Sequence, residues 1–310
     1  MTTADARHAI GASRIYHVNV NCSDLDRSLR FYRDVVGLHT TVRTAPDHQP
    51  GGAFGLDVAQ WDAWILAGDA GTDGVVLDLL EWQQPTPSGT PPASIATRGF
   101  SHLRLGHPDL DALHDALADD GCPALAPPAS MSAPEHTQRS FFARDPDGTL
   151  LEFVEANQVG VVGVSVGCVD LDAALGVYRG VMGLATSQAG EAEFDLASVG
   201  LDTAFAGRWA RCVDLTTSFG VDLLEWPPGT LSEHAGRMAN ELGIFRMAWT
   251  TDDIDRDHAV IASAGLRCYS PPVRLDMNLG EHSVLRALFF EDRDGACLEL
   301  IEPPDVVAAR

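Results

Sequence analysis

The second half of the chain repeats the first half, and this repeat limits the possible folds more than any other feature. The segment YHVNVNCSDLDRSLRFYRDVVGL at residues 16–38 aligns with VGVSVGCVDLDAALGVYRGVMGL at residues 162–184. LDLLEW at 77–82 returns as VDLLEW at 221–226, and DPDGTLLEF at 145–153 matches DRDGACLEL at 292–300. Repetition at a fixed interval indicates duplicated structural units. We therefore expect two related domains, residues 13–157 and 160–305, and 310 residues suffice for two cores.

Each half divides again into two modules with a common pattern, which gives modules one to four at residues 13–86, 97–157, 160–228 and 241–305. Every module begins with a short apolar strand, and an Asp-hydrophobic-Asp element follows at residues 24–26, 109–111, 170–172 and 253–255. The first Asp of each element can cap a helix, and both acids favour the positive end of its dipole. Turn-rich segments and short strands come next. The sequence therefore predicts an α+β fold of four βαβββ modules.

The composition excludes several classes of function. The chain has 21 basic and 44 acidic side chains and a formal charge of −23, so phosphate backbones and anionic lipids would repel it. The sequence contains no lysine, which excludes a Schiff-base lysine and a phosphate-binding P-loop. It has neither an apolar run long enough to span a bilayer nor a secretory signal at its start. We expect a cytoplasmic protein with a small-molecule substrate and without nucleic-acid or membrane partners.

The four modules resemble the vicinal oxygen chelate superfamily, which contains glyoxalases, bleomycin-resistance proteins and extradiol dioxygenases. HVNVNCSDLDRSLRFYRDVVGL and DPDGTLLEF are the most specific stretches, and the resemblance covers residues 13–304. It implies that two modules close their curved sheets into one half-barrel pocket, so that this chain forms two half-barrel domains. It also implies one divalent metal ion inside a pocket, held by residues of the first and last strand of each module.

The resemblance places the metal ligands at specific positions of the first half. The first-strand positions are His17 and His102, and the last-strand positions are Asp78 and Glu152. Imidazoles and carboxylates are suitable ligands for Fe, Mn, Ni, Co or Zn, and such a set leaves positions open for substrate. We predict one metal per chain, bound by His17, His102 and Glu152, with Asp78 as a candidate fourth ligand. The alternative for a single His on an apolar strand is a hydrogen-bonded core residue.

The second half departs from this ligand pattern. Gly163 stands at the position of His17, and Arg246 stands at the position of His102. Glycine offers no ligand and guanidinium repels a cation, so we predict a degenerate site there, in which Arg246 could hold an anion. Asp222, the counterpart of Asp78, persists in this half, which favours a structural role for both. Because only modules one and two together supply a complete set, we predict that these two modules share one barrel.

Three functions remain open at this stage. The first is a glyoxalase- or epimerase-like lyase or isomerase acting on a small oxygenated metabolite, with Glu152 or His136 as the base. The second is an extradiol-type Fe(II) dioxygenase, which Phe141 and Phe142 weaken because they follow His136 where the resemblance implies a Tyr. The third is a drug-binding protein whose pocket is lined by aromatic residues such as Trp61. The oligomeric state is also open, with a homodimer among the expectations.

Overall fold

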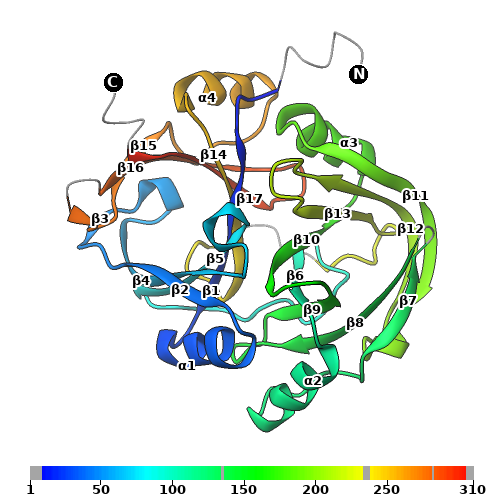
Figure 1. Cartoon of the computed structure of the whole chain (residues 1–310). Helices are drawn as coiled ribbons and strands as arrows, with labels where there is room; N and C mark the ends of the chain where they lie inside the picture. Colours follow the sequence, from blue (N-terminus) through cyan, green and yellow to red (C-terminus); the bar gives the residue numbers. More distant parts are fainter. Residues whose placement is uncertain (1–8, 134–135, 233–237, 281–282, 305–310) are drawn as a thin grey trace.

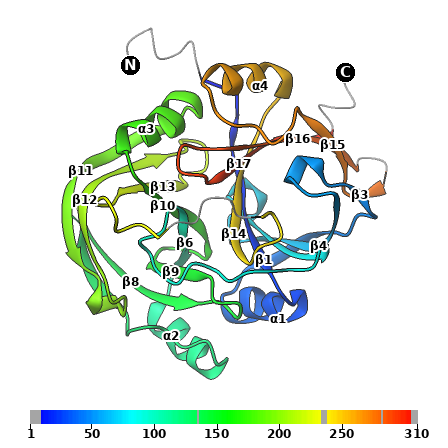
Figure 2. The ribbon, with the colours of Figure 1, turned by 180° about the vertical axis from the view of Figure 1, so that it is seen from behind.

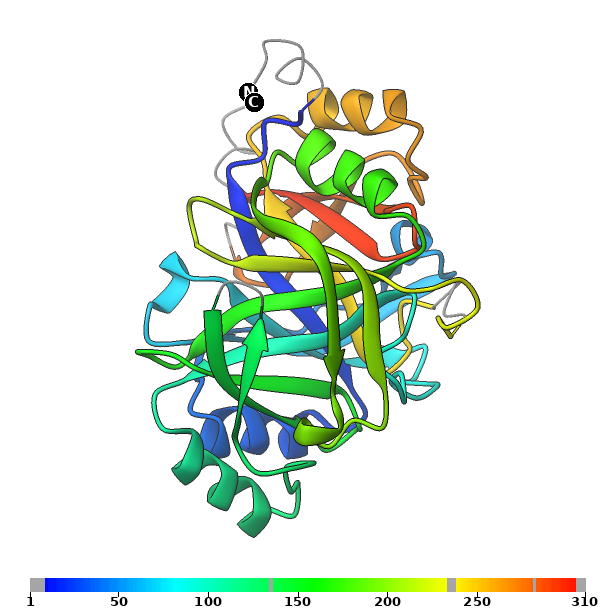
Figure 3. The same cartoon turned by 90° about the vertical axis from the view of Figure 1, so that its right-hand side faces the viewer.

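The computed structural model describes residues 9–133, 136–232, 238–280 and 283–304, and it divides the four modules between two curled sheets (Figures 1–3). Module one contains β1 (Arg14–Cys22), α1 (Leu25–Arg30), β2 (His39–Thr44), β3 (Gln49–Pro50), β4 (Val58–Ala67) and β5 (Val76–Gln84). Module two contains β6 (Gly99–His107), α2 (Leu110–Asp119), β7 (Ala129–Ala133), β8 (His136–Arg144) and β9 (Leu150–Glu155).

The second half of the chain has the same order of elements. Module three contains β10 (Gly160–Cys168), α3 (Leu171–Leu175), β11 (Ala185–Asp195), β12 (Ala204–Val213) and β13 (Gly220–Glu225). Module four contains β14 (Gly243–Thr250), α4 (Ile254–Ser263), β15 (Val273–Asp276), β16 (Val284–Glu291) and β17 (Cys297–Glu302). The predicted α+β architecture of four modules and two half-barrels is confirmed. No helix in the described ranges is both long and apolar enough to cross a membrane.

The helices begin where the repeated Asp-hydrophobic-Asp element predicts. The side chain of Asp24 accepts a hydrogen bond from the backbone N–H of Arg27, and Asp109, Asp170 and Asp253 cap the other three helices in the same way. Short π-helical turns extend α1 over Phe31–Val35 and α3 over Gly176–Val181. Figure 1 shows α1 and α2 at one end of the molecule and α3 and α4 at the other.

The pairing of the modules differs from our prediction. One sheet has the strand order β15-β16-β17-β14-β1-β5-β4-β2, with β3 paired to β4, and therefore joins module one to module four. We call it the first barrel. The other has the order β11-β12-β13-β10-β6-β9-β8-β7 and joins module two to module three, and we call it the second barrel. The prediction that modules one and two share a barrel is wrong.

The connections explain this pairing. Residues 156–159 form a short link from β9 to β10, so module three starts beside module two, and β10 pairs antiparallel with β6. The proline-rich segment 85–98 is much longer and carries the chain from β5 to the start of the second barrel. Module four then returns, and β14 pairs antiparallel with β1. The first and last modules thus form one barrel, and the two middle modules form the other.

Two matching buried hydrogen bonds tie the barrels together. The hydroxyl of Tyr32 in module one donates to Asp145 in module two at 2.9 Å, and Tyr178 in module three donates to Asp292 in module four at 2.9 Å. Burial raises the pKa of Asp145 to about 6, and it raises the pKa of Asp292 to about 6 as well. The first Asp of each repeated D-x-D-G turn therefore joins one barrel to the other.

Candidate functional site

The first barrel gathers four charged or ionisable side chains in its interior, which we call the first polar cluster: His17 on β1, Asp78 on β5, Arg246 on β14 and Glu299 on β17. The strand registers bring them together, because β1 lies parallel to β5 and antiparallel to β14, and β14 lies parallel to β17. All four are buried, with exposed fractions between 3% and 7%. Burial of so many charges requires that they compensate one another.

Arg246 lies between the two carboxylates of this cluster. Its Nε donates to Oε2 of Glu299 at 2.7 Å, and its Nη2 donates to Oδ2 of Asp78 at 2.6 Å. The third guanidinium nitrogen, Nη1, is buried and has no hydrogen-bond partner among the described residues. Burial alone would raise the pKa of Glu299, but Arg246 and His17 together outweigh it and hold this pKa below its ordinary value. Glu299 is therefore ionised at neutral pH.

His17 completes the first polar cluster. Its Nε2 lies 3.3 Å from Oε2 of Glu299 and 3.9 Å from Oδ2 of Asp78. Neither contact has hydrogen-bond geometry, and both ring nitrogens are buried without a hydrogen-bond partner in the described part of the chain. Buried polar groups are normally satisfied, so two unsatisfied nitrogens on one ring indicate a place for a ligand.

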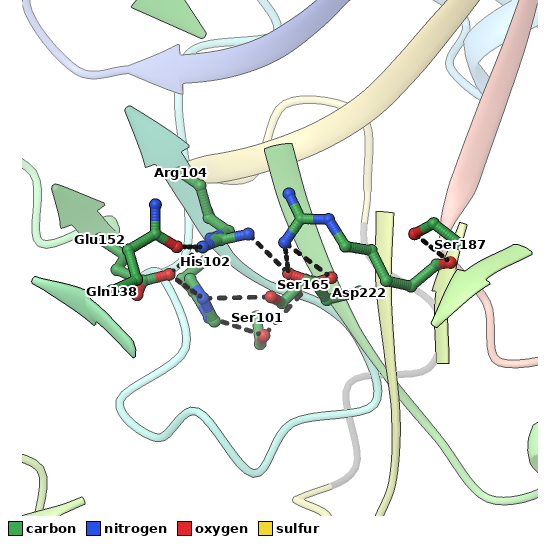
Figure 4. Close-up of polar contacts among 9 residues, drawn as sticks. Ser101, His102, Arg104, Gln138, Glu152, Ser165, Ser187 and Asp222 are labelled. Atoms are coloured by element: carbon green, nitrogen blue, oxygen red, sulfur yellow. Dashed lines mark hydrogen bonds and ion pairs between the residues drawn. The ribbon is translucent and has the colours of Figure 1, made fainter. Parts of the chain in front are cut away.

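The second barrel holds a corresponding set, the second polar cluster: His102 and Arg104 on β6, Glu152 on β9 and Asp222 on β13 (Figure 4). All three guanidinium nitrogens of Arg104 are bonded: Nε to Glu152 at 2.7 Å, Nη1 to Asp222 at 2.8 Å and Nη2 to Gln138 at 3.0 Å. Burial alone would raise the pKa of Glu152, but Arg104 and His102 together outweigh burial, and the pKa falls to about 2.

His102 differs from His17 in its hydrogen bonding. Its Nδ1 lies 3.1 Å from the hydroxyl of Ser101, and its Nε2 lies 3.1 Å from the hydroxyl of Ser165. Nε2 also lies 3.5 Å from Oε2 of Glu152. Among the described residues of the second polar cluster, Oδ1 of Asp222 is the one buried polar atom without a hydrogen-bond partner, whereas the first polar cluster leaves both ring nitrogens of His17 and Nη1 of Arg246 open.

Arg104 fills the space that Gly163 leaves. A Cβ atom at Gly163 would lie 3.4 Å from Cδ of Arg104 and 2.8 Å from the backbone oxygen of Gly220. Sequence reasoning missed Arg104, although a glycine at a position where a ligand was expected was a signal that another side chain enters there. The sequence analysis gave Glu299 no place in the predicted site, but the structure places it beside His17.

Each polar cluster borders a cavity. The cavity of the first barrel measures about 370 Å³ and is largely apolar, with Phe54, Trp61, Leu275 and Phe289 among its lining residues. The cavity of the second barrel measures about 140 Å³, and its lining includes Phe142, Phe205 and Trp226. The first barrel therefore offers more room beside its cluster, and that cluster has unsatisfied groups.

The predicted metal ligands do not meet in one site. His17 and Asp78 lie in the first barrel, whereas His102 and Glu152 lie in the second. The single site with both histidines and Glu152 is therefore a wrong prediction, and it fails because it depended on the pairing of modules one and two. His136 begins β8, but its side chain lies outside the described residues.

The residues of neither cluster fit a resident divalent metal. A guanidinium occupies the centre of each cluster and uses the carboxylate oxygens that a cation would need. Across the described ranges, no group of three His, Cys, Asp or Glu side chains is arranged to hold a metal ion. The carboxylates are thus paired with arginine.

Comparison with known proteins agrees with this architecture. Residues 14–153 match the model of the Glyoxalase/Bleomycin resistance protein/Dioxygenase superfamily. The first half of the chain is therefore similar to this superfamily. A probable lactoylglutathione lyase from Synechocystis is 27% identical over 143 residues, which are 46% of this chain and 95% of that protein.

Solved structures are similar over almost the whole chain. Glyoxalase I from Zea mays has 16% identity and a TM-score of 0.66, over 96% of this chain and 94% of that one. A putative dioxygenase from Bacillus subtilis has 15% identity and a TM-score of 0.61, over 96% of this chain and 87% of that one. At these identities the likeness is one of fold. It extends across both barrels.

Proposed function

We propose that this protein is a glyoxalase-like lyase or isomerase that moves a proton within a small, largely apolar carbonyl compound bound in the first barrel. The observation that carries the proposal is His17, a buried imidazole with two unsatisfied nitrogens, beside an ionised carboxylate and an apolar cavity. The family match and the lactoylglutathione lyase relative support the class of reaction.

The geometry suggests how His17 would act. A proton on Nε2 would face Glu299 and leave the lone pair on Nδ1, so the ring could accept a proton from the carbon next to a carbonyl group. Glu299 stays ionised because of Arg246 and would stabilise the resulting imidazolium. Return of that proton to the neighbouring carbon, with transfer of the hydroxyl proton from one oxygen to the other, completes the isomerisation of an α-hydroxy ketone. The apolar lining, including Trp61 and Phe289, would keep water away from the intermediate.

The dioxygenase alternative has less support in this arrangement. It requires a ligand set of two histidines and a carboxylate for Fe(II), and here His17 and His102 belong to different barrels. We therefore expect the reaction to proceed without oxygen. Oxygen uptake that accompanies turnover would revive this alternative.

The test is the exchange of C–H protons of small α-hydroxy ketones and α-oxo compounds in D₂O, monitored by NMR. His17→Asn should slow exchange by a factor of about 10²–10⁴, the usual contribution of a positioned general base. His102→Asn is the matched control, since His102 also lies beside a glutamate in the second barrel but is bonded to Ser101 and Ser165. It should exchange at the wild-type rate. Equal rates for wild type and His17→Asn would overturn the proposal.

A second candidate is a binding protein that holds an apolar ligand without changing it. The aromatic side chains of Phe54, Trp61 and Phe289 at the first cavity favour this function. The same NMR experiment separates the two functions. A ligand that binds and is recovered without deuterium supports the binding protein, whereas incorporation of deuterium supports the enzyme.

A further inference from the structure

We propose that Arg246 takes the place of a divalent metal in the first barrel, and that its free Nη1 binds the carbonyl oxygen of a neutral ligand. The choice of a carbonyl ligand rests on the proposed function, whereas the replacement of the metal rests on geometry alone. Arg246 stands at a first-strand position, where the family resemblance implied a metal ligand.

The guanidinium is held from two sides by carboxylates. Two charge-assisted hydrogen bonds join it to Asp78 and Glu299, from opposite sides of the barrel seam between β1 and β14. Its carbon lies 5.9 Å from the ring centre of Phe289, which also lines the cavity. Burial would lower the pKa of Arg246, but Glu299 and Asp78 outweigh it, so the pKa stays above its ordinary value and the cation persists.

The free nitrogen determines what Arg246 can bind. Nη1 is a buried donor without a partner in the described chain, so an acceptor oxygen from a ligand would satisfy it. Two carboxylates and one guanidinium leave the cluster with one excess negative charge when His17 is neutral. That charge disfavours a carboxylate ligand and favours a neutral carbonyl. Negative charge that develops on this oxygen during proton transfer to His17 would then face the guanidinium.

The second barrel contains a similar arginine between two carboxylates, but there every guanidinium nitrogen is bonded. Arg104 also bridges an Asp and a Glu, but Gln138 occupies its remaining nitrogen. Arg104 reaches this place from a different sequence position, two residues after His102 and above Gly163. Both barrels therefore pair their carboxylates with arginine, and of these two arginines only Arg246 keeps a guanidinium nitrogen without a partner among the described residues. We expect one ligand per chain.

A cobalt titration tests the replacement of the metal. Wild-type protein should show no visible d–d absorption and no binding heat with micromolar Co²⁺. Arg246→His should bind one Co²⁺ per chain, because the introduced imidazole joins His17, Asp78 and Glu299. The double variant Arg246→His, Glu299→Gln is the control and should lose that binding. Stoichiometric binding of Co²⁺ by wild-type protein, or no binding by Arg246→His with native circular dichroism, would overturn the replacement.

Equilibrium dialysis with acetophenone, a neutral aromatic ketone, tests the ligand assignment. Arg246→Lys keeps the charge but lacks the free Nη1, so its affinity should fall by about tenfold to a hundredfold. Arg104→Lys, the matched change in the second barrel, should bind as the wild type does. Equal affinity of Arg246→Lys and wild type, or no binding by either, would refute the ligand assignment. Binding through Arg246 without C–H exchange would refute only the proposed enzymatic function.

Discussion

Arg246→Met should be strongly destabilising, although methionine fills most of the volume of the arginine stem. The change leaves Asp78 and Glu299 buried, at exposed fractions of 4% and 3%, without their cation. Two charge-assisted hydrogen bonds are lost, and removal of one partner from a buried ion pair costs about 3–5 kcal/mol. Typical domains are stable by about 5–15 kcal/mol, so the variant should fold with a much lower free energy of unfolding.

Urea unfolding followed by circular dichroism measures this cost, and its pH dependence tests the cause. In the wild type the lowered pKa of Glu299 adds stability above its ordinary pKa, and this contribution is lost as the pH falls. In the variant, Glu299 can take up a proton at higher pH, so the difference between the two proteins should shrink between pH 7 and pH 4. Arg33→Met removes an exposed pair with Asp34 and is the control. A midpoint for Arg246→Met equal to that of the control would refute a buried, ionised cluster.

Three further predictions concern the pairing of modules, the ties between the barrels and a close backbone contact. In a double-mutant cycle, the effects of Asp78→Asn and Arg246→Gln on the free energy of unfolding should be non-additive by about 0.5–3 kcal/mol. The effects of Glu152→Gln and Arg246→Gln should be additive, and the reverse pattern would contradict the pairing of modules one and four. Burial raises the pKa of Asp145 to about 6, so the stabilising contribution of this residue is complete below its ordinary pKa and is lost as the pH rises through 6. The thermal midpoint of the wild type should therefore fall between pH 5 and pH 7, and the midpoint of Asp145→Asn should fall less over the same range. Gly167→Ala should cost about 1–3 kcal/mol because its Cβ would collide with the backbone oxygen of Thr97, whereas Gly176→Ala meets open space and should leave the urea midpoint unchanged or raise it.

The local structure of each module could be predicted because its signals lie close together in the sequence. An Asp three residues before the N–H group that it caps is sufficient to place the start of a helix, as at Asp24 and Asp253. Leu25, Leu29 and Tyr32 are spaced as on one face of a helix, and all three are buried. These interactions depend on a few residues each.

The pairing of the modules depends on contacts that the local pattern does not encode. The first strands β1, β6, β10 and β14 are all apolar and buried, so each could pair with any of the others. The connection lengths favour β6 beside β10, whereas the complete ligand set of modules one and two suggested the opposite grouping. The observed pairing of the modules decides which residues form each site. Asp78 therefore contacts Arg246, 168 positions away in sequence, instead of the residues of module two.

A crystal structure of the protein, grown with Co²⁺ and soaked with acetophenone, tests the central claim most directly. The ketone should lie in the cavity of the first barrel, with its oxygen within hydrogen-bond distance of Nη1 of Arg246, and the ring of His17 should lie within reach of its methyl group. Neither polar cluster should show an anomalous peak for cobalt. A cobalt peak between His17, Asp78 and Glu299, or a ketone bound only beside Arg104, would contradict the assignment of a guanidinium-centred site to the first barrel.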